Sequence, residues 1–254
     1  MDYYQILAIS YFSVFGLWWA LYSKSLKFLY PAGQHKIQRP WVQTGLVLLA
    51  AVLVIAIGWL YSKGFLVPEY RLGSVRLSEC LNQMIIFSPI PLMIMLSRQT
   101  FHSAWLPWRY AGPRLALGLA LGLIAIFIFY ALSSARHIDD ILLDVFHLQN
   151  AHLAVQIFLE DLAIALLLSR LSSALSAKSF VLAILAVAVL FSVGHIPASL
   201  ESGVPVSQIF VRSTFDAGLT FAAGFTLYKS KDFLWLFPIH YSMDMMQFYS
   251  GLTP

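Results

Sequence analysis

"FVLAILAVAVLFSVGH", residues 180 to 195, is the stretch that decides the fold of this chain. Its first fifteen residues carry no charged side chain, and about 20 mainly apolar residues are enough to cross a membrane as a helix. The stretch ends on His195, one helical turn after Phe191. Because a histidine in hydrocarbon is costly unless it has a partner or a task, the segment predicts a membrane helix with a polar function in its last turn.

The composition of the whole chain agrees with this interpretation. The 254 residues are 59% hydrophobic and 11% charged, with a mean hydropathy of +0.76, whereas about 25% of residues in a soluble domain are charged. The 16 Lys and Arg residues form no contiguous basic face, which excludes nucleic acid as a partner. The single cysteine, Cys80, excludes an intrachain disulfide and any multi-cysteine metal site.

Windows of membrane-spanning length predict an all-α, polytopic membrane protein with about eight transmembrane helices in a single domain, residues 1–254. The third span is interrupted by Pro89 and Pro91. We expect the first span to be retained, because it has neither the basic start nor the small-residue cleavage site of a signal peptide. The predicted spans are 3–23, 44–62, 81–98, 115–134, 152–171, 179–197, 208–228 and 233–251.

Basic residues in the loops predict the orientation of the spans. With this set of spans, eleven lie on one side and four on the other, and the richer side is normally cytoplasmic. We therefore expect both termini outside the cytoplasm, in a multi-pass protein of the bacterial inner (cell) membrane. The eleven are Lys24, Lys27, Lys36, Arg39, Arg98, Arg109, Arg114, Arg170, Lys178, Lys229 and Lys231, and the four are Lys63, Arg71, Arg76 and Arg136.

Ionisable residues inside the predicted spans are few and confined to the second half of the chain. Such residues are rare in membrane helices and are hypotheses about function by default. Their distribution predicts scaffold spans in residues 1–150 and a core with a polar site in residues 151–254. They are Glu160, Asp161, His195, Arg212, Asp216, His240 and Asp244.

The expected depths of these side chains place them in one cavity. At 1.5 Å per residue, Glu160 lies roughly 12 Å and Asp244 about 10 Å from the outer ends of their spans. His240 and Asp244 are four residues apart and therefore share one helix face. Phe191 and His195 have the same spacing, so the phenyl ring is expected to pack against the imidazole.

Glutamate, aspartate and two histidines in one cavity favour hydrolytic chemistry. One option is zinc bound by Glu160, His195 and His240 with an open position for water. The other is metal-free, with Glu160 as a general base and a neutral histidine stabilising the oxyanion. The sequence leaves both open. The same residues also have a purely structural interpretation. Each histidine would then be hydrogen-bonded in the protein core, and Arg212 and Asp216 would form a structural ion pair.

The order of these residues resembles the CPBP intramembrane proteases, the CAAX-prenyl-protease and bacteriocin-processing family. An acidic pair, F-x-x-x-H and H-x-x-x-Asp lie on successive late spans, within about residues 150–250. The resemblance implies a helical bundle whose conical cavity opens to one leaflet. It also implies that Glu160 and His195 activate the attacking water, while His240 and Asp244 complete the site or the oxyanion pocket.

The first motif departs from the family pattern. The family has E-E-x-x-x-R, whereas this chain has "EDLAIA", with Asp161 as the second acid and Ala165 in place of the arginine. Arg170 is a poor substitute, because it lies roughly 15 Å from Glu160 by helical rise. Arg212 on span seven is the candidate replacement for the missing cation, and Asp216, four residues further along its own helix, is the competing partner of Arg212.

Three functions are compatible with these features. The first is an intramembrane endopeptidase that cleaves membrane-embedded or lipid-tethered peptides, with Glu160, Asp161, His195, His240 and Asp244 as its site. The second is a catalytically silent relative that binds a partner membrane protein or peptide. The third is a proton-coupled transporter, which the lack of an inverted repeat disfavours. In each case the lipid bilayer surrounds the protein, and we expect that folding requires no metal.

Overall fold

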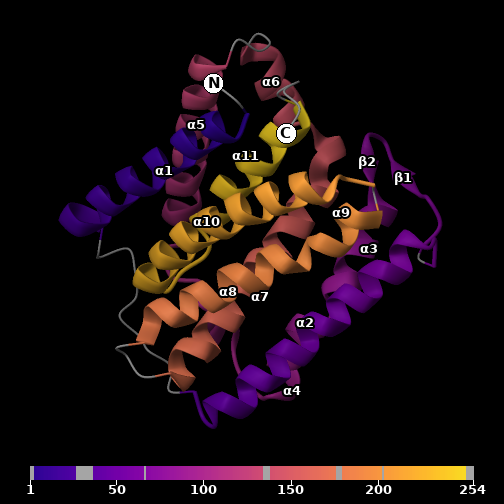
Figure 1. The fold of residues 1–254 in the computed structure, drawn as a ribbon, viewed down its shortest axis with the longest axis vertical. Helices are drawn as coiled ribbons and strands as arrows, with labels where there is room; N and C mark the ends of the chain where they lie inside the picture. Colours follow the sequence, from indigo (N-terminus) through magenta and orange to yellow (C-terminus); the bar gives the residue numbers. More distant parts are fainter. Residues whose placement is uncertain are drawn as a thin grey trace.

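The computed structural model describes residues 3–26, 37–65, 67–133, 138–175, 179–201 and 203–249 (Figure 1). It is an all-α protein apart from one antiparallel pair of two-residue strands. The elements are α1 (Tyr3–Leu21), η1 (Tyr22–Leu26), α2 (Pro40–Ser62), β1 (Arg71–Leu72), β2 (Val75–Arg76), α3 (Leu77–Phe87), α4 (Pro89–Leu96), η3 (Phe101–Ala104), α5 (Ala111–Leu132), α6 (Ile138–Val145), η4 (Leu148–Asn150), α7 (Ala151–Ala174), α8 (Phe180–Gly194), α9 (Ile196–Glu201), α10 (Val206–Ser230) and α11 (Leu236–Tyr249).

Among the described residues, five helical segments are long and apolar enough to cross a membrane, and a bent pair raises the number to six. This makes the chain a multi-pass integral membrane protein, with fewer such helices than the eight spans predicted. The five segments are Tyr3–Lys24, Pro40–Ser62, Ala111–Leu132, Leu148–Ala174 and Phe180–Glu201.

The bent pair is the third predicted span, and its proline content explains the break. α3 ends at Phe87 and α4 begins at Pro89, with an angle of 47° between them. Proline has no backbone N–H to continue the hydrogen-bond ladder, and its ring clashes with the carbonyl four residues earlier. The interruption expected from Pro89 is therefore present as a sharp bend.

The last two predicted spans, α10 and α11, are not among the described segments long and apolar enough to cross a membrane, and the reason differs between them. α10 is 25 residues long, but Arg212, Asp216 and other polar side chains lower its hydropathy. α11 has 14 residues, fewer than the about 20 that cross the hydrocarbon core. α10 carries Arg212 and Asp216, and α11 carries His240 and Asp244, so ionisable residues of the second half of the chain lie on the two helices that fall short of a membrane span.

The helices are arranged around α7 and α8. Figure 1 shows these two helices between α2 on one side and α10 and α11 on the other. α7 packs against α2, α3, α8, α10 and α11, while α1 packs against α5 and α10. The core helices α7, α8, α10 and α11 therefore lie between the scaffold helices α2 and α3 on one side and α1 and α5 on the other.

Two glycines of α5 set the position of α11. Gly118 and Gly122 form a small-xxx-small pair, which allows close helix packing in membranes. A Cβ at Gly118 would collide with the backbone carbonyl of Trp235, and one at Gly122 would lie 3.0 Å from the carbonyl oxygen of Pro238. α11, which carries His240, is thus seated directly on the backbone of α5.

Some of the predictions lie outside the described residues. Lys27, Lys36, Arg136 and Lys178 all contribute to the predicted orientation, and none of them is among the residues that the structure describes. The same holds for the ends of two predicted spans, residue 134 and residues 250–251.

Candidate functional site

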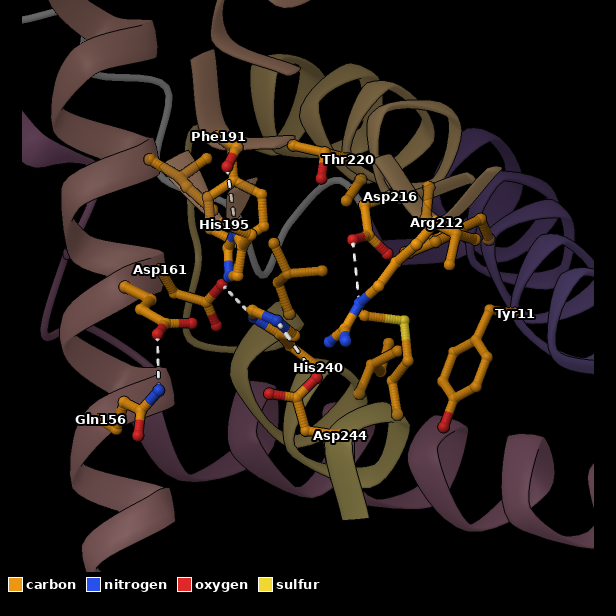
Figure 2. Close-up of a pocket in the computed structure, with 18 residues that line it drawn as sticks. Tyr11, Gln156, Asp161, Phe191, His195, Arg212, Asp216, Thr220, His240 and Asp244 are labelled. Carbon is orange, nitrogen blue, oxygen red and sulfur yellow. Dashed lines mark hydrogen bonds and ion pairs between the residues drawn. The ribbon is translucent and has the colours of Figure 1, made fainter. Parts of the chain in front are cut away.

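A cavity of about 190 Å³ lies among α1, α7, α8, α10 and α11 (Figure 2). All five site residues expected from the sequence line it: Glu160, Asp161, His195, His240 and Asp244. They come from three separate parts of the chain, so the fold brings together side chains that are up to 84 residues apart, from 160 to 244. Apolar residues, including Ile164 and Leu219, complete the wall.

Asp161 holds His240 in a defined orientation. The Asp161 side chain is 1% exposed, and its Oδ1 lies 2.9 Å from Nδ1 of His240. Because an ionised carboxylate can only accept, Nδ1 of His240 donates in this hydrogen bond. The other imidazole nitrogen, Nε2, lies on the opposite edge of the ring, where it is available to the cavity.

Asp244 lies beside this second nitrogen of His240. Its Oδ1 is 3.7 Å from Nε2, one helical turn along α11. This distance is too long for a hydrogen bond but short enough for electrostatic attraction. His240 is therefore flanked by Asp161 and Asp244, and its Nε2, which makes no hydrogen bond among the described residues, is free to turn to a ligand.

His195 is fixed by its own helix. Its Nδ1 lies 2.9 Å from the backbone carbonyl of Phe191, and since a carbonyl only accepts, Nδ1 carries the proton. In the neutral ring, Nε2 is then an acceptor. The Phe191 ring packs edge-on against the imidazole at 4.6 Å between ring centroids, as the spacing predicted.

Local sequence explains the placement of His195. α8 ends at Gly194 and α9 starts at Ile196, so the helix is interrupted at the histidine. Pro197 follows two residues later and cannot donate a backbone hydrogen bond into the preceding turn. The interruption leaves His195 at a helix end facing the cavity.

Glu160 is positioned by Gln156, which is not among the site residues expected from the sequence. Gln156 Nε2 donates to Glu160 Oε1 at 2.9 Å, one turn away on α7. The i,i+4 spacing of the two was visible in the sequence as a possible same-face pair. The hydrogen bond holds one carboxylate oxygen of Glu160, and the other oxygen makes no hydrogen bond among the described residues.

Arg212 has the second of its two candidate partners, Asp216, and does not replace the missing arginine. Its Nε lies 3.8 Å from Asp216 Oδ2 on its own helix. Among the described residues it makes no ion pair with Asp161, whose partner is His240. The position of the family arginine, Ala165, is fully buried in apolar packing. Asp161 has thus gained a histidine partner from α11 rather than an arginine partner from α10.

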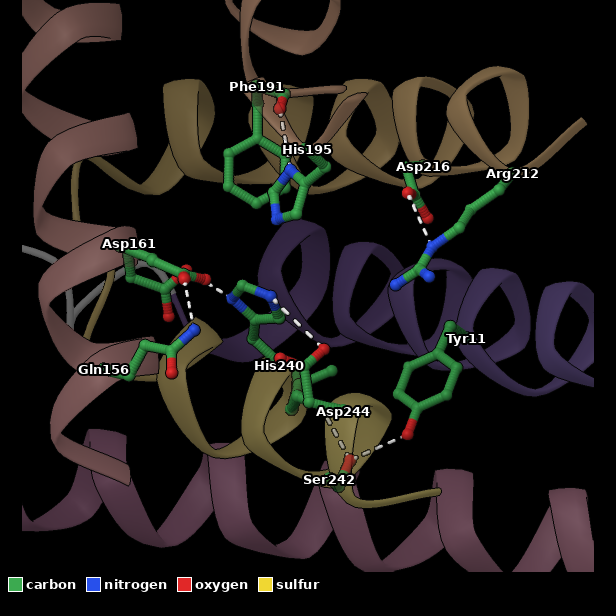
Figure 3. A network of polar contacts seen from close by, with 12 residues as sticks. Tyr11, Gln156, Asp161, Phe191, His195, Arg212, Asp216, His240, Ser242 and Asp244 are labelled. Carbon is green, nitrogen blue, oxygen red and sulfur yellow. Dashed lines mark hydrogen bonds and ion pairs between the residues drawn. The ribbon is translucent and has the colours of Figure 1, made fainter. Parts of the chain in front are cut away.

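The cavity also includes a polar contact from the predicted scaffold. The Tyr11 hydroxyl on α1 lies 3.0 Å from the hydroxyl of Ser242 on α11 (Figure 3). Tyr11 also lines the cavity. No motif in the sequence pointed to this residue, since a tyrosine in an apolar span is ordinary core packing. The boundary at residue 150 between scaffold and site is therefore not a boundary of the cavity.

One group of cavity residues has the composition of a metal site. Glu160, His240 and Asp244 each offer one ligand atom, and these atoms lie within 4.8 Å of one another. Ligands about 2.0–2.2 Å from a tetrahedral zinc ion lie roughly 3.4 Å apart, so the three side chains would have to move closer together to hold an ion. The zinc ligands expected from the sequence are Glu160, His195 and His240. The cluster in the structure contains Asp244 instead of His195.

Comparisons with known proteins give no match for this chain. No protein-family model, no curated protein and no solved structure matches it. The function must therefore be inferred from the residues of the cavity themselves.

Proposed function

We propose that this chain is an intramembrane endopeptidase of the CPBP type, which cleaves membrane-embedded or lipid-tethered peptides. The observation that supports the proposal is the single cavity lined by Glu160, His195, His240 and Asp244. Isolated polar groups in hydrocarbon are too costly to be retained without use. The proposal includes a location in the bacterial inner membrane, with α10 and α11 crossing the bilayer beside α7 and α8.

In this proposal Glu160 and His195 activate the attacking water. Glu160 has one carboxylate oxygen held by Gln156. The other oxygen accepts the proton of the attacking water as a general base and then gives it to the leaving amide nitrogen as the C–N bond breaks. His195 has its proton on Nδ1, bonded to the Phe191 carbonyl, so its Nε2 accepts the second hydrogen and orients the oxygen. Both side chains are fixed before the substrate arrives, which lowers the entropic cost of reaching the transition state.

His240 would stabilise the negative charge that develops on the peptide carbonyl. Its Nδ1 is tied to Asp161 at 2.9 Å, and its Nε2 lies 3.7 Å from Asp244 without a hydrogen bond. A donor that is preorganised but incompletely paired can bond more strongly to the oxyanion than to the ground state. Asp161 thus orients a donor, in addition to filling the second position of the acidic motif.

Zinc chemistry is the other form of the same hydrolysis. Glu160, His240 and Asp244 would hold the ion, and Asp161 would orient His240 as carboxylates do for metal-binding histidines. A bound zinc ion supplies a Lewis acid and a more nucleophilic water. In that case His195 would be the remaining base.

The second candidate is a catalytically silent CPBP-like protein that binds a partner membrane protein or peptide. The observation that favours it is Ala165, which is fully buried where the family motif has arginine. The cavity would then serve as a binding pocket, and Glu160 would act through its hydrogen bonds alone.

The experiment that separates the two is peptide cleavage by the purified protein in liposomes. The wild type is incubated with a library of lipid-anchored peptides, and products are identified by mass spectrometry. Glu160→Gln should lower cleavage about 10²–10⁴-fold, the usual contribution of a general base. Glu69→Gln is the matched control, since Glu69 is exposed and pairs only with Arg71 outside the cavity.

The results distinguish the candidates clearly. Loss of cleavage in Glu160→Gln, with cleavage intact in Glu69→Gln, supports the endopeptidase. Peptide capture without cleavage, unchanged in Glu160→Gln, supports the silent binding protein. Chelation that stops cleavage while the fold persists supports the zinc form over the metal-free form.

A further inference from the structure

Arg212 is the one basic side chain other than histidine that lines the cavity, among the residues that the structure describes. It lies on α10, less than two turns after the helix begins at Val206. Its side chain is 37% exposed. The guanidinium therefore reaches both the cavity and its surroundings, and the water-activating chemistry proposed above does not use it.

The contacts of Arg212 leave the two terminal nitrogens of its guanidinium group free. Only Nε approaches Asp216, at 3.8 Å. Within the described part of the chain, the two terminal nitrogens make no hydrogen bond or ion pair. Figures 2 and 3 show them pointing away from Asp216, toward the side of the cavity that holds His240 and Asp244. The paired terminal N–H groups of arginine match the two oxygens of a carboxylate.

The charges of the cavity wall make Arg212 the favoured contact for an anionic group. The wall contains four carboxyl groups, those of Glu160, Asp161, Asp216 and Asp244. An anionic group entering the cavity is repelled by them and needs a cation that is not already fully paired. His240 is held by Asp161 through Nδ1, and the mechanism above uses its Nε2 for the peptide carbonyl. Arg212 is therefore the remaining group positioned to receive the anion.

We propose that Arg212 binds a carboxylate of the peptide substrate and thereby selects peptides that carry one near the scissile bond. This inference rests on the proposed function and names the substrate class for the same site. Figure 3 places Asp161 and Arg212 on opposite sides of His240. A substrate with its carbonyl at the Glu160 side would therefore extend its carboxylate across the cavity to α10. Arg212 is a specificity-determining residue in this scheme and takes no part in the bond cleavage.

The test measures peptide binding, so that it does not depend on cleavage. The wild-type protein is placed in nanodiscs of zwitterionic phosphatidylcholine. The probes are N-palmitoylated hydrophobic peptides with N-methylated backbones, which resist hydrolysis. They are made as the free acid, as the C-terminal amide, and as the amide with one aspartate. Dissociation constants are measured by fluorescence anisotropy.

The wild type should bind the carboxylate-bearing peptides about tenfold tighter than the neutral amide, as expected for a charge-assisted bidentate contact. Comparison of the free acid with the aspartate peptide shows which carboxylate is used. Arg212→Gln should bring the acid-to-amide ratio to about one, and Arg212→Lys should retain part of the preference. Thr214→Val is the control, since Thr214 is exposed on the same helix and bonds only its own backbone.

Asp216→Asn separates substrate binding from a structural ion pair. If Arg212 binds the carboxylate, releasing it from Asp216 should keep or raise the acid preference. If Arg212 serves only its ion pair with Asp216, Asp216→Asn should lower the acid-to-amide binding ratio as much as Arg212→Gln does. That result would overturn the proposal. Equal binding of acid and amide by the wild type, or a preference that survives Arg212→Gln, would also overturn it.

Two further outcomes identify other causes. If adding anionic phosphatidylglycerol to the nanodiscs abolishes the preference of the wild type, Arg212 is a site for lipid phosphate and the proposal fails. If none of the peptides binds, the proposed peptidase function fails together with the role of Arg212. Equal binding of all the peptides would leave the peptidase function standing and remove only the role of Arg212.

Discussion

The protein buries charged groups in two regions that differ in how those groups are paired. In the cavity, Glu160 and Asp244 face open space, and the approach between His240 and Asp244 is 3.7 Å. At the other region, where α7 ends and α5 begins, Arg114 and Asp232 form an ion pair of 2.7 Å with both side chains 0% exposed. In the first region the charged side chains line a cavity, and in the second they pair directly with one another or with polar groups of the protein.

We call the second region the buried ion-pair network. It consists of two neighbouring sets of contacts, the ion pair of Arg114 with Asp232 and the hydrogen bonds of Arg170 with Ser103 and Gln99. Arg114 also donates to the backbone carbonyls of Pro107 and Tyr110, and Arg170 donates to Ser103 and Gln99. Asp232 Oδ1 accepts from the backbone N–H of Leu234 at 3.0 Å. Burial raises the pKa of Asp232 to about 6, while Arg114 acts in the opposite direction.

The difference teaches how to separate structure from function among buried charges. A charge engaged by several hydrogen-bond partners of the protein holds segments together, here the 99–110 segment, α5, α7 and the turn before α11. A charge that faces a cavity with one partner is available to a ligand. Changes in the network should therefore affect unfolding, and changes in the cavity should affect activity or binding.

The largest effect is expected from breaking the ion pair of the network. Asp232→Ala leaves the guanidinium of Arg114 buried without its counter-ion, which typically costs about 3–5 kcal/mol. Unfolding in detergent with increasing denaturant measures the change. The double variant Arg114→Met/Asp232→Leu should be less destabilised than Asp232→Ala, because it leaves no unpaired charge. Equal stability of Asp232→Ala and wild type would contradict the structural role.

A change in the cavity should show the opposite profile. Asp161→Asn keeps the size of the side chain but weakens its hold on His240, so cleavage should fall about 10²-fold. The free energy of unfolding should change much less than in Asp232→Ala. Cleavage rates and denaturant unfolding on the same preparations test this. Large destabilisation by Asp161→Asn would place that residue with the structural charges.

A smaller effect should appear in the pH dependence of stability. Lys231 lies beside the network, with its Nζ 3.4 Å from the ring centre of Tyr228 and 4.3 Å from that of Trp105. Burial, with Lys229 nearby, lowers the pKa of Lys231 from 10.5 to about 7. Between these pH values the unfolded chain holds a proton that the folded chain lacks. Stability should therefore rise from pH 7 toward pH 10.

The variant Lys231→Met tests this assignment. It should remove the part of the pH dependence that comes from Lys231. Because Lys231 is only partly buried and solvent screens its charge, this part is expected to be well below the roughly 5 kcal/mol that an unscreened shift of this size would give. Thermal unfolding at several pH values measures it. An identical slope in the wild type and Lys231→Met would show that other groups titrate in this range.

The smallest effect is expected from chelation. The helices pack through apolar contacts and the buried network, so EDTA should leave the unfolding transition unchanged. This holds whether or not cleavage uses zinc at Glu160, His240 and Asp244. Unfolding caused by EDTA would instead mean that a cation supports the fold.

The sequence predicted the helical membrane class and the break at Pro89, because apolar length and proline chemistry are local properties. It did not predict which helices meet the length and hydropathy of a membrane span. α11 is short and α10 is polar, and their place in the fold depends on tertiary packing. The seat of α11 on Gly118 is such a contact, which no local pattern specifies.

The composition of the site was also readable from the sequence, but its pairing was not. Ionisable residues in apolar spans identified Asp161, His195 and His240 as members of one cavity. The partner of Asp161 depends on how α7 and α11 approach, and it is His240 rather than Arg212. Tyr11 and Gln156 were missed because a tyrosine or a glutamine in a helix has many ordinary uses.

The contact of Gly118 and Gly122 with α11 has a consequence for dissecting this protein. The backbone of α5 is the surface on which the start of α11 rests, and α5 belongs to the first 150 residues. A fragment containing only residues 151–254 would keep Glu160, His195 and His240 but would lose that surface. Transplanting the late helices into another membrane protein would therefore require the glycine face to be transplanted as well.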